Sequence, residues 1–256
     1  MIDIHNHLLP NLDDGSRSSE QSVAVLSRFR DEGVVAVVCT PHLSASSIAV
    51  DGEKQIVARD QALFSLRGRV AGVELHPGFE IMLDQPLPPI AVGDRRYALA
   101  GSRYYLVEFP LRIAGEFTTA VLQQMTSAGV VPVVAHPERY RDCTMDTVAA
   151  WKQAGCVIQV DATTLTSSSG RGQCARAYVE AGLADVLAAD NHGDGRGLWT
   201  GRDYVQRCKG ARVQRCKEAE VLTSVNPGRV IADRVLEPVE PMVLRRTLVE
   251  RIKEIW

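Results

Sequence analysis

Short apolar runs rich in β-branched residues alternate with amphipathic segments along most of this chain. Several of the runs are nearly continuous in Val, Ile, Leu and Ala, which is typical of parallel strands that are buried on both faces. We expect strands at residues 2–5, 34–39, 70–75, 104–109, 130–135, 157–161 and 185–190.

The segments between these runs have the signals of helices. Residues 18–33 begin with Ser18 and Gln21 at capping-box spacing and end at Gly33, which favours a left-handed helix stop. Residues 116–129, 146–155 and 175–182 repeat this design and also end in glycine. Alternating strands and helices predict a parallel α/β sheet. Seven such units predict a single domain over residues 1–256, a distorted (β/α)7 barrel, with an open doubly wound sheet as the alternative.

The composition argues against several classes of protein. A formal net charge of −2 gives no sign of the clustered basic surface typical of nucleic-acid binding. No run of about 18 apolar residues is present, so we expect no membrane span, and the N-terminus lacks the pattern of a secretory signal. We therefore expect a cytoplasmic protein. Its six cysteines form no Cys-x-x-Cys motif, and we expect them to be free thiols.

Metal-ligand residue types gather where the expected strands end. Five of the six histidines and four carboxylates occupy such positions, and only His76 is interpreted as an ordinary packed or surface residue. In a β/α barrel these ends and their loops meet at one mouth, where uncompensated acids and imidazoles would shift one another's pKa values strongly. Mixed imidazole and carboxylate ligands without thiolate suit manganese, iron, zinc or cobalt. The candidate ligands are His5, His7, Asp14, His42, Glu80, Glu108, His136, Asp190 and His192.

The chain lacks the sequence motifs of two known classes of phosphoryl-transfer enzyme. Cysteine-dependent tyrosine phosphatases need Cys-x5-Arg, yet no arginine stands six residues after any cysteine. No Gly-Lys dipeptide exists either, so a P-loop is absent from the sequence.

Six segments occur in an order that resembles a known family: "DIHNHLLPNLDDG", "TPH", "PGFE", "VEFP", "AHPER" and "DNH". They resemble the PHP (polymerase and histidinol phosphatase) superfamily, and more narrowly its manganese-dependent protein-tyrosine phosphatases of capsular and exopolysaccharide loci, the CpsB/YwqE type. The likeness runs from Met1 to the "SVNPGRVIAD" segment. The "H-x-H-x-L-P-x-x-D-D-G" opening and "H-P-E-R" are the motifs specific to that subgroup.

The resemblance implies three divalent cations, each with its own ligands. His5, His7, Glu80 and Asp190 would hold one; Glu80, Glu108 and His136 a second; Asp14, His42 and His192 a third. Phosphate-binding arginines of the family fall on Arg139 and Arg196. The chain reads "AADNHG" where the family usually has Ser-Asp-Ala-His, and the loop from His192 to Arg196 is one residue short. Arg202 is therefore the alternative to Arg196.

The implied activity is hydrolysis of phosphotyrosine by metal-activated hydroxide. Its substrate would be a phosphotyrosine protein, a bacterial tyrosine kinase that regulates capsule or exopolysaccharide synthesis. The alternatives are another PHP phosphoesterase such as a histidinol-phosphate phosphatase, a metal-dependent amidohydrolase or deoxyribonuclease, and a metal-binding scaffold. Amidohydrolases often need a bridging lysine, and no lysine stands at an expected strand end.

Two further features carry structural interpretations only. "YVQRCKGA" is followed directly by "RVQRCKEA", which we interpret as a small duplication that lengthens a surface helix. The C-terminal segment "PMVLRRTLVERIKEIW" has an amphipathic pattern that we expect to pack on the rest of the fold.

Overall fold

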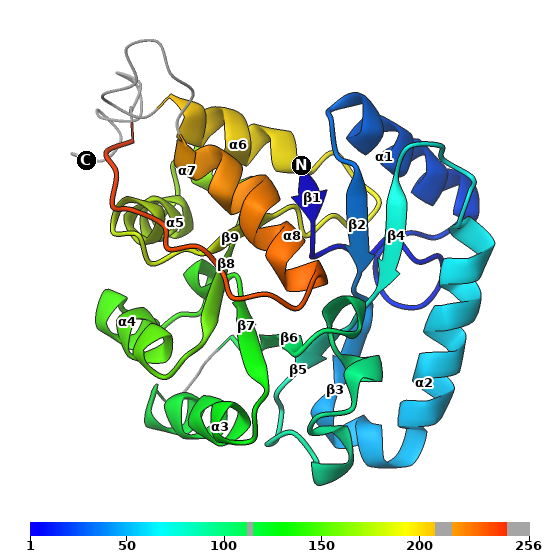
Figure 1. The fold of residues 1–256 in the computed structure, drawn as a ribbon, viewed down its shortest axis with the longest axis horizontal. Helices are drawn as coiled ribbons and strands as arrows, with labels where there is room; N and C mark the ends of the chain where they lie inside the picture. Colours follow the sequence, from blue (N-terminus) through cyan, green and yellow to red (C-terminus); the bar gives the residue numbers. More distant parts are fainter. Residues whose placement is uncertain (112–114, 208–216, 245–256) are drawn as a thin grey trace.

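The structure of the chain, a computed structural model, describes residues 1–111, 115–207 and 217–244. Strands occupy the middle of the molecule and helices lie around them (Figure 1). The strands in the described ranges are β1 (Ile2–Asp3), β2 (Ala36–Cys39), β3 (His42–Ser44), β4 (Glu74–Pro77), β5 (Glu80–Met82), β6 (Tyr104–Glu108), β7 (Val131–Ala135), β8 (Val157–Asp161) and β9 (Val186–Ala188).

All pairings between these strands are parallel, as the alternation predicted. One sheet has the order β1-β2-β4 and the other has the order β3-β5-β6-β7-β8-β9. Strand β2 is interrupted and continues as β3, and β4 is interrupted and continues as β5. The pairing of β2 with β4 is accordingly continued by the pairing of β3 with β5. An isolated parallel bridge joins Asn6, after β1, to Asn191, after β9.

Helices connect the strands along the chain. They are α1 (Ser19–Asp31), α2 (Ala45–Leu66), α3 (Gly115–Ser127), α4 (Met145–Gln153), α5 (Gly170–Glu180), α6 (Leu198–Gln206), α7 (Lys217–Glu220) and α8 (Asn226–Ile231). Short 3-10 turns are η1 (Pro89–Ala91), η2 (Arg95–Tyr97), η3 (Leu99–Gly101), η4 (Pro137–Arg139) and η5 (Thr164–Thr166), and a π-helical turn, η6 (Val221–Val225), joins α7 to α8. No described helix is both long and apolar enough to cross a membrane.

Helix α1 forms for the reasons that its sequence indicates. The Ser18 hydroxyl accepts a hydrogen bond from the amide of Gln21, and Gly33 takes a positive φ of 89° just beyond the helix. Gln21 does not complete the capping box on Ser18, because its side-chain oxygen accepts from the amide of Arg17 instead.

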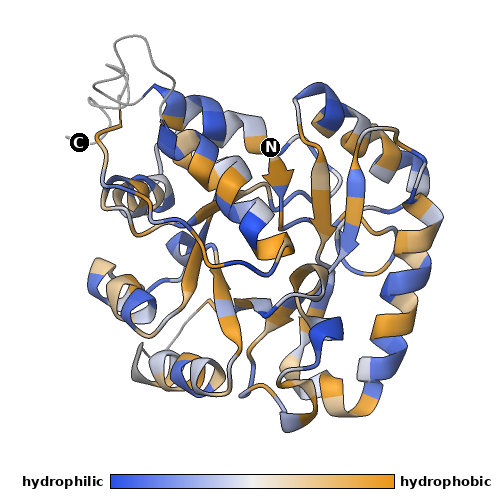
Figure 2. Cartoon of the chain, in the orientation of Figure 1, coloured by the Kyte–Doolittle hydropathy of each residue, from blue (hydrophilic) through white to orange (hydrophobic). Residues whose placement is uncertain are grey.

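The core has two parts, which lie on opposite faces of the strands. On β6, Tyr105 and Val107 join the large cluster beneath the helices, whereas Tyr104 and Leu106 join a smaller cluster on the other face. Figure 2 shows the strands as mostly apolar and the helices as apolar on one side. Strands β2, β6, β8 and β9 are buried at every residue, and therefore on both faces, as parallel strands covered on each side are.

Three expectations about the elements need correction. The strand expected at residues 70–75 begins only at Glu74, because Gly72 turns the chain with φ 83°. The strand expected at 34–39 starts at Ala36, and His42 belongs to a separate strand after an interruption at Pro41, which has no amide hydrogen for the ladder. The 22-residue helix α2 was not expected from the sequence, where Gly52 lies in its interior.

Two sequence features fall partly outside the described residues. Most of the "VQRCK" duplication lies in residues 208–216, and the C-terminal pattern lies in 245–256 apart from its beginning. Leu244 is buried in the large core cluster, so the packing expected of that segment is confirmed at this one position.

Close packing between α6 and the loop after β8 depends on Gly201. A Cβ atom there would lie 2.7 Å from the Cβ and 2.8 Å from the Cα of Ala162. We expect Gly201→Ala to lower the free energy of unfolding by about 1–3 kcal/mol, the usual cost of overpacking, in urea titrations. Gly170→Ala is the control, because its Cβ meets no atom within 4 Å in helix α5. Equal unfolding midpoints for the two variants would contradict this account.

Candidate metal centre

The nine candidate ligands converge at the carboxyl ends of the strands. The alternation of side chains along a strand explains part of this. On β6, Glu108 is in step with Tyr104 and Leu106, which face the smaller core cluster. After β9, Asp190 is in step with Val186 and Ala188, which face the same cluster. The other ligands follow or open neighbouring strands. The structure brings eight of the nine into three overlapping groups, and the ninth, His136, contacts Glu80 at their edge.

The first group consists of His5, His7, Glu80 and Asp190, all of them buried. Oε2 of Glu80 lies 3.1 Å from Nε2 of His5 and 3.2 Å from Nε2 of His7. Oδ1 of Asp190 lies 3.3 Å from each of the same two nitrogens. Ligand atoms about 2.1 Å from a single cation lie roughly 3.0–3.5 Å from one another. The spacing of this group therefore fits one divalent cation.

Two further groups surround the first. His42, Glu80 and Glu108 form one, with Nδ1 of His42 3.1 Å from Glu80 and 3.3 Å from Glu108. The other contains His7, Asp14, His42 and His192, with Asp14 Oδ1 3.6 Å from His42 and 3.5 Å from His192. The four residues of the first implied set and the three of the third thus lie together as expected.

His136 lies at the edge of the second implied set. Its Nε2 is 2.9 Å from Oε1 of Glu80 but 4.0 Å from Oε2 of Glu108. His42 lies closer to Glu108 than His136 does, and it is His42 that forms a ligand group with Glu80 and Glu108.

The chemistry of Glu80 supplies an independent test of the metal interpretation. Its Oε2 is buried and makes no hydrogen bond of acceptable geometry, although imidazole nitrogens of three histidines lie within 3.2 Å. Ligand atoms around a common cation lie this close together without forming hydrogen bonds to one another, because each directs its lone pair at the cation. The residues present therefore fit a metal.

A second layer of residues orients the imidazoles. Nδ1–H of His5 donates to Oε1 of Gln159 at 2.9 Å, and Nδ1–H of His7 donates to Oδ2 of Asp13 at 2.7 Å. Each bond leaves the ring turned so that Nε2 faces the carboxylates of the centre. This is the usual arrangement of metal-binding histidines.

The loop after β1 is shaped to bring Asp13 to His7. A Cβ on Gly15 would lie 2.1 Å from the carbonyl oxygen of His7, so only glycine fits there. The amide of Gly15 donates to Oδ1 of Asp13 at 2.9 Å, and the amide of His42 donates to Oδ2 of the same carboxylate at 3.1 Å. The paired acids and glycine of the opening motif are thus explained: Asp14 faces the centre and Asp13 supports it.

Two candidate ligands have a strained backbone. His136 has φ 34° and Asp190 has φ 44°, both in the left-handed region that residues with a side chain seldom adopt. Each follows the last residue of β7 or β9 closely, where the chain turns sharply. Strain of this kind persists where surrounding contacts hold it, and it gathers at functional sites.

The charges of the centre compensate one another. Burial by itself would raise the pKa of Glu80, but the charge of His5 and contacts with His136 and His42 hold that pKa well below its usual value. Burial would lower the pKa of His7, yet its bonds to Asp13, Asp190 and Glu80 raise it well above 6.5. Imidazolium groups therefore balance the carboxylates, and a cation that binds here must displace their protons.

Two arginines reach this centre. Nη2 of Arg139 donates to Asp190 and, at 2.7 Å, to Oδ2 of Asp161, while Nη1 of Arg196 lies 3.3 Å from Oδ2 of Asp190. Burial, with the positive charge of Arg202, lowers the pKa of the Met1 amino group at the start of β1, which places Arg202 near that group. Of the two alternatives, Arg196 is therefore the one in contact with a candidate ligand.

The described cysteines are free, as expected, and three of them have unreactive thiols. Burial raises the pKa values of Cys39, Cys143 and Cys156 to about 12. His76, the sixth histidine, lies on β4 with Nε2 3.5 Å from Glu74 and belongs to none of the three groups.

Residues 1–231 of the chain match the model of a family described as capsular polysaccharide synthesis, CpsB/CapC. The chain belongs to the CpsB/CapC family. The resemblance that the opening motif and "H-P-E-R" predicted is therefore confirmed.

Individual relatives carry names of the same kind. The chain is 26% identical over 257 residues to the tyrosine-protein phosphatase CpsB of Streptococcus pneumoniae, covering 92% of this chain and 100% of that protein. It is 26% identical over 196 residues to the tyrosine-protein phosphatase YwqE of Bacillus subtilis, covering 75% and 77%. A solved structure from work on YwqE and CpsB, described as unique metal-dependent tyrosine phosphatases, has a TM-score of 0.78 at 21% identity, covering 96% and 100%. This last likeness shows the fold.

Three supporting residues of this CpsB/CapC chain were not identified from the sequence: Asp13, Gln159 and Asp161. Gln159 and Asp161 are polar residues on β8, a strand whose five residues are all buried. A polar side chain within a buried apolar run was the available signal, because it must find a partner in the interior.

Asp13 offers a test of the supporting layer in this CpsB/CapC chain. We expect Asp13→Asn to weaken Mn²⁺ binding roughly 10- to 100-fold, because a neutral amide cannot raise the basicity of His7 as the Asp13 carboxylate does. Calorimetric titration of chelator-treated protein measures the affinity, and circular dichroism checks the fold. Asp84→Asn is the matched control, since Asp84 also accepts from a backbone amide, that of Ser46, but belongs to none of the ligand groups. Unchanged affinity in Asp13→Asn would refute the supporting role.

Proposed function

We propose that this chain is a metal-dependent protein-tyrosine phosphatase. The observation that carries the proposal is the overlap of three ligand groups around Glu80, with two guanidinium groups directed at the adjacent Asp190. Clustered divalent cations and arginines suit the hydrolysis of phosphate monoesters, which is extremely slow without catalysis. Membership of the CpsB/CapC family and the names of its relatives point to phosphotyrosine as the substrate.

The ligands would be shared among up to three divalent cations, which we propose to be manganese. His5, His7, Glu80 and Asp190 would hold one, Glu80 with Glu108 and His136 or His42 a second, and Asp14, His42 and His192 a third. Such cations, when bound, lower the pKa of coordinated water and neutralise phosphoryl oxygens. Imidazole and carboxylate ligands suit manganese, although iron, zinc and cobalt accept the same donors.

Arg139 and Arg196 would bind the phosphoryl group. Their side chains are 24% and 28% exposed, so a substrate can reach them, whereas Asp190 between them is buried. A guanidinium group offers paired donors that match two phosphoryl oxygens, which a lysine does not. Asp161 would position Arg139, and it is itself held by the amide and hydroxyl of Thr163 at 2.8 and 2.7 Å.

We also propose that the two sheets form one distorted (β/α)7 barrel within a single domain. The strand order supports this, because β2 with β3 and β4 with β5 act as two long interrupted strands. Hydrogen bonds also join the segments after β1 and β9: the amide of Asp190 donates to the carbonyl of His5, and the amide of His7 donates to that of Asn191, both at 2.8 Å.

The physiological substrate we propose is a bacterial tyrosine kinase of capsule or exopolysaccharide synthesis. Support comes from the description of the family and from the phosphatase names of its relatives. A cytoplasmic location stays a prediction.

The proposed activity is tested by phosphate release from chelator-treated protein, with and without added Mn²⁺. The substrates are a phosphotyrosine peptide, the matching phosphoserine peptide and histidinol phosphate. We expect manganese-dependent release from the phosphotyrosine peptide alone, with no phosphorylated protein trapped on acid quenching. Release from histidinol phosphate alone would make the chain a different phosphoesterase, and no release with metal bound would refute phosphatase activity.

The role of Arg139 is tested by exchanging its planar group for a compact charge. We expect Arg139→Lys to lower kcat/KM for the phosphotyrosine peptide roughly 10- to 100-fold, or about 1.4–2.8 kcal/mol of transition-state stabilisation. Arg171→Lys, at an exposed position of α5, is the control and should leave the rate unchanged. Equal rates for both variants would remove Arg139 from the phosphate-binding role.

A further inference from the structure

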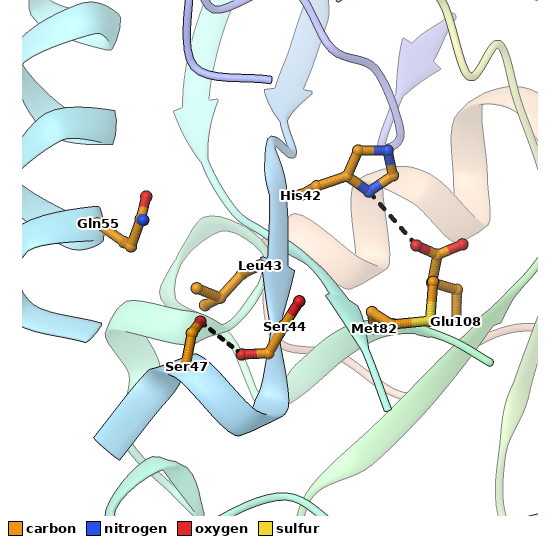
Figure 3. A pocket seen from close by; sticks show the side chains of 7 residues that line it. All are labelled: His42, Leu43, Ser44, Ser47, Gln55, Met82 and Glu108. Atoms are coloured by element: carbon orange, nitrogen blue, oxygen red, sulfur yellow. Dashed lines mark hydrogen bonds and ion pairs between the residues drawn. The ribbon is translucent and has the colours of Figure 1, made fainter. Parts of the chain in front are cut away.

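A cavity of about 370 Å³ opens beside the candidate metal centre. It is lined by His42, Leu43, Ser44, Ser47, Gln55, Met82 and Glu108 (Figure 3). His42 and Glu108 are also candidate metal ligands, so one wall of the cavity belongs to the centre itself. The remaining lining comes from β3, β5 and the first half of α2. Its volume is within the range of roughly 300–1,000 Å³ that small-ligand sites have.

The part of the centre that borders this cavity is accessible to solvent. The side chains of His5, His7 and Glu80 are at most 1% exposed, whereas that of His42 is 37% exposed. A phosphoryl group bound beside His42 and Glu108 can therefore direct its ester oxygen and organic group into the cavity.

The walls of the cavity suit an aromatic ring more than a charged group. Met82 and Leu43 supply a thioether and an aliphatic surface, and thioethers make favourable contacts with aromatic rings. None of the seven lining residues is a lysine or an arginine, and Glu108 contributes negative charge. Ser47, whose hydroxyl donates to the carbonyl of Ser44 at 2.8 Å, and Gln55 add small or neutral polar groups.

We infer that this cavity is the subsite for the aromatic ring of the substrate, and that Met82 and Ser47 determine selectivity for aryl over alkyl phosphomonoesters. The inference rests on the proposed function and names the residues that select its substrate. Ser47 lies in the first turn of α2, where a larger side chain would fill the cavity. Met82 contributes its apolar wall next to Glu108 (Figure 3).

The test measures binding of two phosphonates to Mn²⁺-loaded protein by calorimetry. Phenylphosphonate and methylphosphonate carry the same charged group and neither can be hydrolysed, so differences in leaving-group chemistry do not enter. We expect the wild type to bind phenylphosphonate at least tenfold more tightly. In Ser47→Phe and Met82→Ala that ratio should fall to about threefold or less, with methylphosphonate affinity unchanged, and Met82→Leu should restore it.

Ser65→Phe is the matched control. Ser65 is on the same helix and donates a similar local bond, to the carbonyl of Ala62 at 2.7 Å, but it does not line the cavity. Its phosphonate ratio should equal that of the wild type.

The outcomes separate this inference from the proposed function. An aryl preference that survives in both Ser47→Phe and Met82→Ala would overturn the inference, even if phosphotyrosine is hydrolysed. A preference that collapses in these variants supports the subsite, even if the phosphatase assay fails. Equal binding of the two phosphonates by the wild type also overturns it.

Discussion

The centre of this protein depends on one buried carboxylate. Glu80 is inaccessible to solvent, and nitrogens from His5, His7 and His42 approach the same oxygen within 3.2 Å. Such a group is costly in an apolar interior unless opposite charge compensates it. Imidazolium protons supply that charge in the metal-free chain, and divalent cations would supply it in the loaded protein. This concentration of charge explains why arginines contact Asp190 and why a second layer of residues orients the imidazoles.

The fold makes that concentration possible by the way its strands end. Interruptions at Pro41 and Gly78 allow β2 and β4 to resume as β3 and β5, whose first residues are His42 and Glu80. A Cβ on Gly78 would lie 2.9 Å from a side-chain carbon of Val38, so the chain can pass there only without a side chain. At β9, a left-handed backbone directs Asp190 toward the same point. Apolar strands thus carry polar side chains at their carboxyl ends, and these side chains are oriented before any ligand binds.

Much of this arrangement could be predicted because the signals are local. The residues of β8 were predicted at 157–161 and are found there, since Val157, Ile158 and Val160 indicate a buried strand even though two polar residues lie among them. Helix α2 was missed because its signals are weak: Gly52 interrupts it, and that glycine is explained by Tyr97, whose hydroxyl would lie 2.3 Å from a Cβ. Asp13 and Gln159 were missed because a residue that supports a ligand has no characteristic spacing from it. Gln159 is 154 positions from His5 in the sequence, yet its side chain accepts the bond that orients that ring.

The sequence by itself determined the class of fold, the nine candidate ligands and the family, because periodicity, residue type and short motifs are properties of neighbouring positions. Tertiary structure alone decided how those ligands divide into groups. The resemblance placed His136 with Glu108, but Nδ1 of His42 lies 3.3 Å from Glu108 whereas Nε2 of His136 lies 4.0 Å from it. It also brought Arg196 to within 3.3 Å of Asp190, and it opened a cavity between α2 and the strands β3 and β5. The reason is physical: distances between residues far apart in the chain follow from how strands and helices pack, and no local pattern records them.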